Sequence, residues 1–166
     1  MSTSADTTTR TIQIETSGLM DRVRKEAAVC AAKRMAADPT AFSRMGMTTP
    51  EESFLAPTLA EATQQLIATC FGRFSAGTGS EDDGVAFTFP TNVKASALTI
   101  AASECDSAIV AYTLAKWYEL SMPDLYTAKM EEFARHAKNV LALINERTAP
   151  TYTRPTTWNT KVTTIE

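Results

Sequence analysis

Glu132 and His136 are the pair of side chains whose spacing best suits metal binding or acid–base chemistry. Glu132 lies four residues before His136, the only histidine, so a helix would place both on one face. With carboxylates from a second helix, such a pair could hold a metal ion inside a helical bundle. The chain has no Glu-x-x-His repeat to complete a two-metal site. We therefore interpret the pair as an exposed i,i+4 ion pair and keep a metal-dependent enzyme as an alternative.

The other motifs that carry chemistry are incomplete. The glycine-rich residues 77–80 lack the Lys-Ser/Thr of a phosphate-binding loop, and acids follow them. Asp82 and Asp83 lack the alternating oxygen ligands and the terminal Glu of an EF-hand. No serine lies in a Gly-x-Ser-x-Gly context. The sequence therefore predicts no catalytic, cofactor-binding or metal-binding residues, and a protein that is not an enzyme.

Composition and charge narrow the functional class. The chain has 166 residues, of which 44% are hydrophobic, and a formal net charge of −3, so one folded domain is expected and DNA binding is disfavoured. Cys30, Cys70 and Cys105 match no metal or redox spacing, which predicts buried thiols in a reducing compartment. Because neither a signal peptide nor a membrane span is expected, we expect the protein to be made and kept in the cytoplasm, or to leave the cell by lysis.

The first half of the chain alternates between strand and helix patterns. Residues 11–15 have the two-residue period of a short strand, with Ile12 and Ile14 on one face. Residues 17–37 have the period of an amphipathic helix that Asp38-Pro39 ends. Two helix starts follow, at Thr49 and Thr58; we expect Pro57 to end the first helix, and the second to run over residues 59–74.

The second half predicts a small β insertion and a helical hairpin. Residues 75–84 are rich in glycine and acid and predict a loop, and residues 85–89 predict a short strand. Asn92 is expected to cap a helix over residues 95–120, and a turn at residues 121–124 leads to a helix over residues 125–147. The last helix has a heptad seam that suits packing against the preceding helix or against a second copy: Tyr126, Met130, Phe133, Ala137, Val140 and Ile144.

These patterns predict a mainly α protein, a helical bundle with a long C-terminal helical hairpin, a short β insertion, and extended N- and C-terminal arms. The expected parts are an N-terminal arm at 1–15, a bundle at 16–147 with the insertion at 75–90, and a C-terminal arm at 148–166. The C-terminal arm carries Tyr152, Arg154 and Trp158, residue types that often anchor interfaces. We expect these three residues, with Ile12 and Ile14, to contact a neighbouring subunit by strand addition.

Residues 87–158 resemble small head-tail connector, or neck, proteins of tailed bacteriophages, especially those of Bacteroides-like hosts. The residues that carry the resemblance are the segment 87–92, the helix end 108–120, the Met-Pro-Asp turn at 122–124 with Tyr126, and the tail from Pro150 to Trp158. It implies a helical subunit of a homo-oligomeric ring, commonly twelvefold, that contacts the portal and other neck or tail proteins in the virion.

A ring of this kind surrounds the path of DNA. The acidic residues Glu81, Asp82 and Asp83 would then line a channel through which DNA passes without sequence-specific binding. The alternative from a different class is a cytoplasmic helical adaptor without a virion role, which would bind a partner helix along the heptad seam.

Overall fold

The computed structural model describes residues 10–45, 47, 52–78, 84–119 and 122–146, with only the backbone described at residues 42, 44, 52–54 and 78. The elements in chain order are β1 (Arg10–Glu15), α1 (Thr16–Arg34), α2 (Ala41–Met45), α3 (Glu52–Thr69), β2 (Ser75–Thr78), β3 (Gly84–Phe89), α4 (Ala95–Tyr118) and α5 (Pro123–Asn145). The predicted class is confirmed: the fold is mainly helical, with a small sheet and a long C-terminal helical hairpin.

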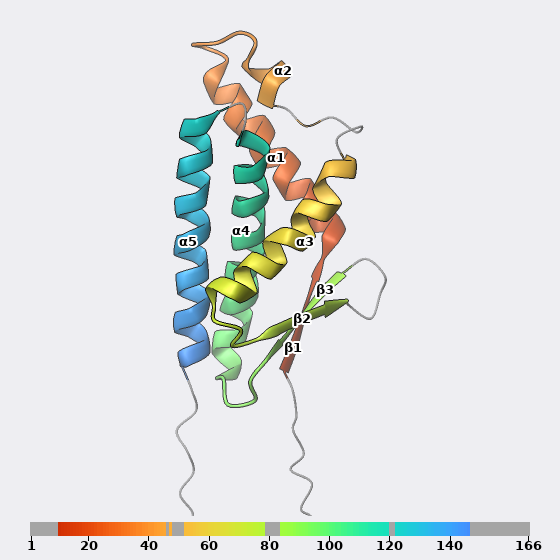
Figure 1. Ribbon diagram of the computed structural model, residues 1–166, viewed down its shortest axis with the longest axis vertical. Coiled ribbons are helices and arrows are strands. Elements are labelled where there is room, and N and C mark those ends of the chain that lie inside the picture. The colour runs from red at the N-terminus through yellow and green to blue at the C-terminus, as the bar shows by residue number, and fades with distance from the viewer. Residues whose placement is uncertain (1–9, 46, 48–51, 79–83, 120–121, 147–166) are drawn as a thin grey trace, which may run out of the picture.

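α4 lies at the centre of the molecule, and α5 packs beside it along most of its length, on the outer side (Figure 1). Residues 108–115 of α4 are all buried, because α1 and α3 also pack against this helix. In α5 the buried residues are Phe133, Ala137, Val140 and Ile144, four members of the predicted seam. The seam therefore packs on the preceding helix of the same chain.

α3 corrects the prediction that Pro57 separates two helices. The helix runs without interruption from Glu52 to Thr69 and contains Pro57, so the predicted helix start at Thr58 is also wrong. Proline inside a helix removes a hydrogen bond and costs about 3 kcal/mol. Leu55, Leu59, Ala62 and Leu66 are nevertheless all buried, because the apolar face stays in phase across the proline. Burial of that face offsets the cost of Pro57.

The three strands form one antiparallel sheet in the order β1-β3-β2. β1 pairs with β3 so that Ile12 lies opposite Phe87 and Ile14 opposite Val85. The predicted strand at residues 11–15 is thus confirmed, and residues 10–15 belong to the sheet of the same chain. Residues 75–78, predicted as loop, form strand β2 instead, because pairing with β3 compensates for the weak strand propensity of glycine and serine.

The start of α4 differs from the prediction as well. Its N-cap position is Lys94, which makes no side-chain capping hydrogen bond, and Asn92 lies in the turn before it. Val93, between the two, is fully buried. The N-cap residue is therefore Lys94 and not Asn92, and burial of Val93 holds the turn that precedes the helix against the core.

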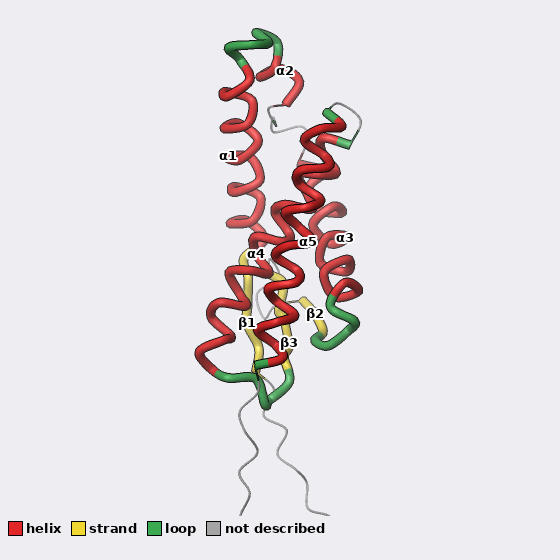
Figure 2. Tube along the Cα trace, turned by 90° about the vertical axis from the view of Figure 1, so that its left-hand side faces the viewer, coloured by secondary structure: helices red, strands yellow, loops and turns green. Residues whose placement is uncertain are grey.

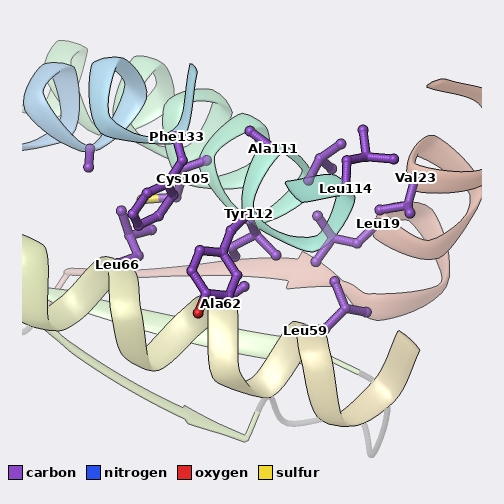
Figure 3. Close-up of a cluster of buried hydrophobic side chains, with 14 of the residues drawn as sticks. Leu19, Val23, Leu59, Ala62, Leu66, Cys105, Ala111, Tyr112, Leu114 and Phe133 are labelled. Atoms are coloured by element: carbon purple, nitrogen blue, oxygen red, sulfur yellow. The ribbon is translucent and has the colours of Figure 1, made fainter. Parts of the chain in front are cut away.

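One hydrophobic core joins the helices to the sheet. Figure 3 shows Tyr112 of α4 and Phe133 of α5 packed against α3, and Leu19 and Val23 of α1 near Leu114. At the sheet, Phe74, Phe87 and Phe89 form an aromatic cluster, in which the Phe74 and Phe89 rings stack 5.0 Å apart. None of the helices in the described residues combines the length and hydropathy needed to cross a membrane.

Cys30, Cys70 and Cys105 are all free thiols, as predicted, and they differ in how deeply they are buried. Cys70 and Cys105 are buried, whereas Cys30 is only partly buried. Burial raises the pKa of Cys70 to about 11 and raises that of Cys105 further. The two buried thiols therefore behave as small core residues and are not reactive nucleophiles.

Candidate interaction surface

In the structure, Glu132 and His136 belong to a larger cluster of polar side chains, whose other members the sequence did not predict. The two side chains are 3.9 Å apart, between His136 Nε2 and Glu132 Oε1. The shorter contact is to Glu104 of α4, whose Oε2 lies 2.7 Å from His136 Nδ1 and also accepts a hydrogen bond from Asn139. His136 is 15% exposed, so the prediction of an exposed pair is wrong: packing of α4 on α5 covers the ring.

Hydrogen bonds set the charge of Glu104. Burial alone would raise the pKa of its carboxyl group, but the hydrogen bonds from His136 and Asn139 outweigh burial, and the pKa lies below its usual value. An ionised carboxylate only accepts hydrogen bonds, so Nδ1 of His136 carries the donated proton. The pair therefore acts as a polar cross-link between α4 and α5.

Further ion pairs extend this cluster to α1. The Nζ atom of Lys129 in α5 lies 3.1 Å from Oε2 of Glu26 in α1 and 2.8 Å from Oε2 of Glu132. Arg22 of α1 pairs with Glu26 and with Asp106 of α4. No group of three or more His, Cys, Asp or Glu side chains in the described parts of the chain is arranged to hold a metal ion. These charges pair with one another across three helices, and each exposed pair adds at most about 1 kcal/mol to the packing of the helices.

A hollow of about 280 Å³ lies between α3 and the β2–β3 hairpin. The described side chains that line it carry no titratable group; they belong to Ala60, Thr63, Gln64, Ala76, Gly77, Gly84 and Val85. The Thr63 hydroxyl donates a hydrogen bond to the Leu59 carbonyl oxygen at 2.9 Å, so it is engaged within α3.

The two segments that the sequence assigns to partner binding attach to the fold at adjacent points. The guanidinium group of Arg10, at the start of β1, donates a hydrogen bond to the carbonyl oxygen of Val93 at 2.7 Å. The next residue, Lys94, donates its backbone N–H to the carbonyl oxygen of Glu146 at 3.2 Å, and their side chains form an ion pair. The start of β1 and the end of α5 accordingly lie at the same end of the molecule (Figure 2).

An exposed aromatic residue lies close to this end of the fold. Phe71, directly after α3, is 78% exposed, the largest exposure among the big apolar side chains described. It has a positive φ of 57°, and Gly72 follows with a φ of 61°. The turn closes the helix by a hydrogen bond from the Gly72 N–H to the Ile67 carbonyl at 2.9 Å. Arg73 then hydrogen-bonds the Asn145 side chain at the end of α5, at 3.0 Å.

Sequence reasoning missed this turn because it extended the helix to residue 74. Phe74, the predicted end of the apolar face, is buried, but it reaches the core from beyond the turn. Gly72 was the available signal, since glycine is enriched directly after helices where the backbone becomes left-handed. Phe71, Gly72 and Arg73 together are called the α3 turn below.

Of the predicted interface and channel residues, the structure describes only Ile12 and Ile14. Ile12 and Ile14 are partly buried and pack against the core of their own subunit. β1 is an edge strand, so its outer side is the part of residues 10–15 to which a partner strand could still add. The other predicted interface and channel residues lie outside the described residues: Tyr152, Arg154, Trp158, Glu81, Asp82 and Asp83.

Comparison with known proteins does not add a relative to this picture. No protein-family model, no curated protein and no solved structure matches the chain.

Proposed function

We propose that this chain is a structural, non-catalytic subunit of a homo-oligomeric ring, of the kind that connects the head and tail of a tailed bacteriophage. The observation that carries the proposal is the adjacency of the two attachment points, where Arg10 contacts Val93 and Glu146 contacts Lys94. Two segments that start side by side can contact the same neighbour, so one subunit boundary would receive both arms.

The organisation of the core supports this role. The helices and the sheet share one continuous hydrophobic cluster, so the subunit can fold before it assembles. Arms that bind only a neighbour make assembly conditional on that neighbour, and contacts between different faces of successive copies close into a ring. Several of the described charges form ion pairs that join two helices, which suits a structural subunit.

The proposal includes a place and partners. The ring belongs to the neck or tail region of a virion, contacts the portal and other neck or tail proteins, and assembles in the host cytoplasm. Glu81, Asp82 and Asp83 would repel the DNA backbone and let DNA pass through the channel.

The alternative, a cytoplasmic adaptor that binds a partner helix along the heptad seam, has less support. Phe133, Ala137, Val140 and Ile144 of that seam are buried against the same chain. A partner helix would need another surface or would have to displace α4. No observation on the described surface favours such an exchange.

Removal of residues 148–166 tests the proposal. We expect the full chain, alone or with its portal protein, to form rings that are visible by negative-stain electron microscopy. Light scattering should give these rings a mass that is a multiple of the mass of one chain. The truncated chain should keep its helical circular dichroism and its cooperative unfolding but stay monomeric, because one continuous hydrophobic cluster already joins the described helices and the sheet. A full chain that stays monomeric under both conditions contradicts the proposal, and a truncated chain that forms the same rings refutes the role of the arm.

A further inference from the structure

We infer that the α3 turn, with Phe71 at its tip, is the binding site for the C-terminal segment 147–166 of a second copy of this chain. This inference rests on the proposed function and adds to it the surface that receives the arm. It is carried by the exposure and backbone of Phe71, by the rigidity of the turn, and by the place where the segment attaches.

Phe71 combines two unfavourable features at one position. A phenylalanine side chain exposed to 78% gains almost none of the free energy that burial of its ring provides. A left-handed backbone costs a residue with a side chain about 1–2 kcal/mol, and asparagine or glycine would occupy the same turn with less strain. Folding of the isolated subunit gains no free energy from Phe71. Binding of a partner that covers the phenyl ring would gain the free energy of its burial.

The α3 turn is held rigidly, as an interface anchor must be. The backbone hydrogen bond from Gly72 to Ile67 ties it to α3, and Arg73 ties it to Asn145 at the end of α5. Cys70, directly before the turn, is fully buried and its thiol contacts the Ala137 carbonyl oxygen at 3.5 Å. A pre-organised ring loses little conformational entropy on binding, which favours affinity.

The contact between Arg73 and Asn145 places the start of segment 147–166 beside the turn of its own subunit. Pro150 and Pro155 favour an extended chain, which covers at most about 20 Å between Glu146 and Tyr152 and about 40 Å between Glu146 and Trp158. A subunit of this size has a radius of gyration of about 15 Å. A segment of this length can therefore reach the α3 turn of a neighbouring copy.

The chemistry of the segment matches an exposed ring. Tyr152 and Trp158 are large aromatic side chains, and aromatic pairs stabilise contacts beyond the area that they bury. In a ring, each subunit would offer its α3 turn to the previous copy and its segment to the next one. That is a head-to-tail contact, in which the two partners use different surfaces.

Mixing two variants that lack opposite halves of the contact tests the inference. Phe71→Asn keeps the C-terminal arm but removes the phenyl side chain that the arm would bind; asparagine tolerates the left-handed backbone of this position. Deletion of residues 148–166 keeps the phenyl side chain of Phe71 but removes the arm. We expect each variant alone to sediment as a monomer at concentrations where the full chain assembles, with a loss of affinity of about 30-fold for Phe71→Asn, as for an interface hot spot. Mixed together, the two should form a one-to-one heterodimer through the single intact contact.

Two controls separate this contact from a general effect on the surface. Ile100→Asn changes another exposed apolar residue, 54% exposed on α4, and should leave assembly unchanged. Phe71→Tyr keeps an aromatic ring and should retain assembly.

The outcomes distinguish the inference from the proposed function. If the full chain assembles and Phe71→Asn assembles equally well, the α3 turn is not the binding site, and the ring proposal stands. If both variants are monomeric but do not pair when mixed, the segment and the turn do not meet between copies, and the inference is overturned. If the full chain itself never assembles, the proposed function fails.

Discussion

Phe133 provides the most direct test of how the hairpin is packed. Its side chain is 5% exposed and contacts the Tyr112 ring edge-on, with the ring centroids 5.2 Å apart. Tyr112 in turn donates a hydrogen bond from its hydroxyl to Glu61 of α3, at 2.6 Å. Phe133→Ala would therefore leave a cavity at the place where α3, α4 and α5 meet.

The expected loss can be estimated from these contacts. Truncation of a buried phenylalanine to alanine costs about 3–5 kcal/mol, of which the aromatic pair with Tyr112 supplies about 0.5–1.5 kcal/mol. A domain of this kind unfolds with a free energy of about 5–15 kcal/mol, so the change removes a large share of it. The melting temperature should fall by about 6–20 °C.

Phe71→Ala is the matched control, because it makes the same chemical change on an exposed phenylalanine. Measured at concentrations where the chain is monomeric, it should alter the free energy of unfolding by no more than about 0.5 kcal/mol. Urea unfolding followed by circular dichroism measures both variants, and the Phe133→Ala loss should not depend on protein concentration, since the seam packs within one chain. A loss below about 1 kcal/mol, or a loss that grows on dilution, would refute the packing of α5 on α4.

Three further predictions concern single buried groups. The Tyr118 hydroxyl is buried, makes no hydrogen bond of normal geometry among the described residues and has the weakly hydrogen-bonding Cys30 thiol beside it, so Tyr118→Phe should change the free energy of unfolding by no more than about 1 kcal/mol in urea titrations; a larger loss would show a stronger partner for the hydroxyl. Glu104 has a lowered pKa in the folded state, so its contribution to stability is complete above its unfolded pKa, about 4.5, and is lost as the pH falls through the folded-state pKa. Glu104→Gln should therefore flatten the acid limb of a plot of melting temperature against pH. An unchanged acid limb would contradict the contact with His136. Alkylation of the native protein followed by mass spectrometry should modify partly buried Cys30 first, because burial raises the pKa of Cys70 and Cys105; equal rates at all three would show that the core opens.

The sequence by itself determined the helical hairpin and the strands at residues 11–15 and 85–89, each of which the structure extends by one residue at its start. In α5 the apolar residues recur with a strict heptad period, and the Met-Pro-Asp turn separates this helix from the previous one, so local pattern and tertiary packing agree. The strand that starts the chain has only two apolar residues, Ile12 and Ile14, yet their alternation was enough to identify it.

Tertiary structure alone decided the remaining features. Pro57 ends a helix by every local rule, but α3 continues through it because burial of Leu55 and Leu59 on the same face offsets the cost. Glu104 lies 32 positions before His136 in the chain, so no spacing rule could pair them before α4 packed on α5. The exposure of Phe71 also follows from three-dimensional packing: sequence pattern assigns an apolar residue to the core, whereas only the path of the chain at the end of α3 turns this ring outward.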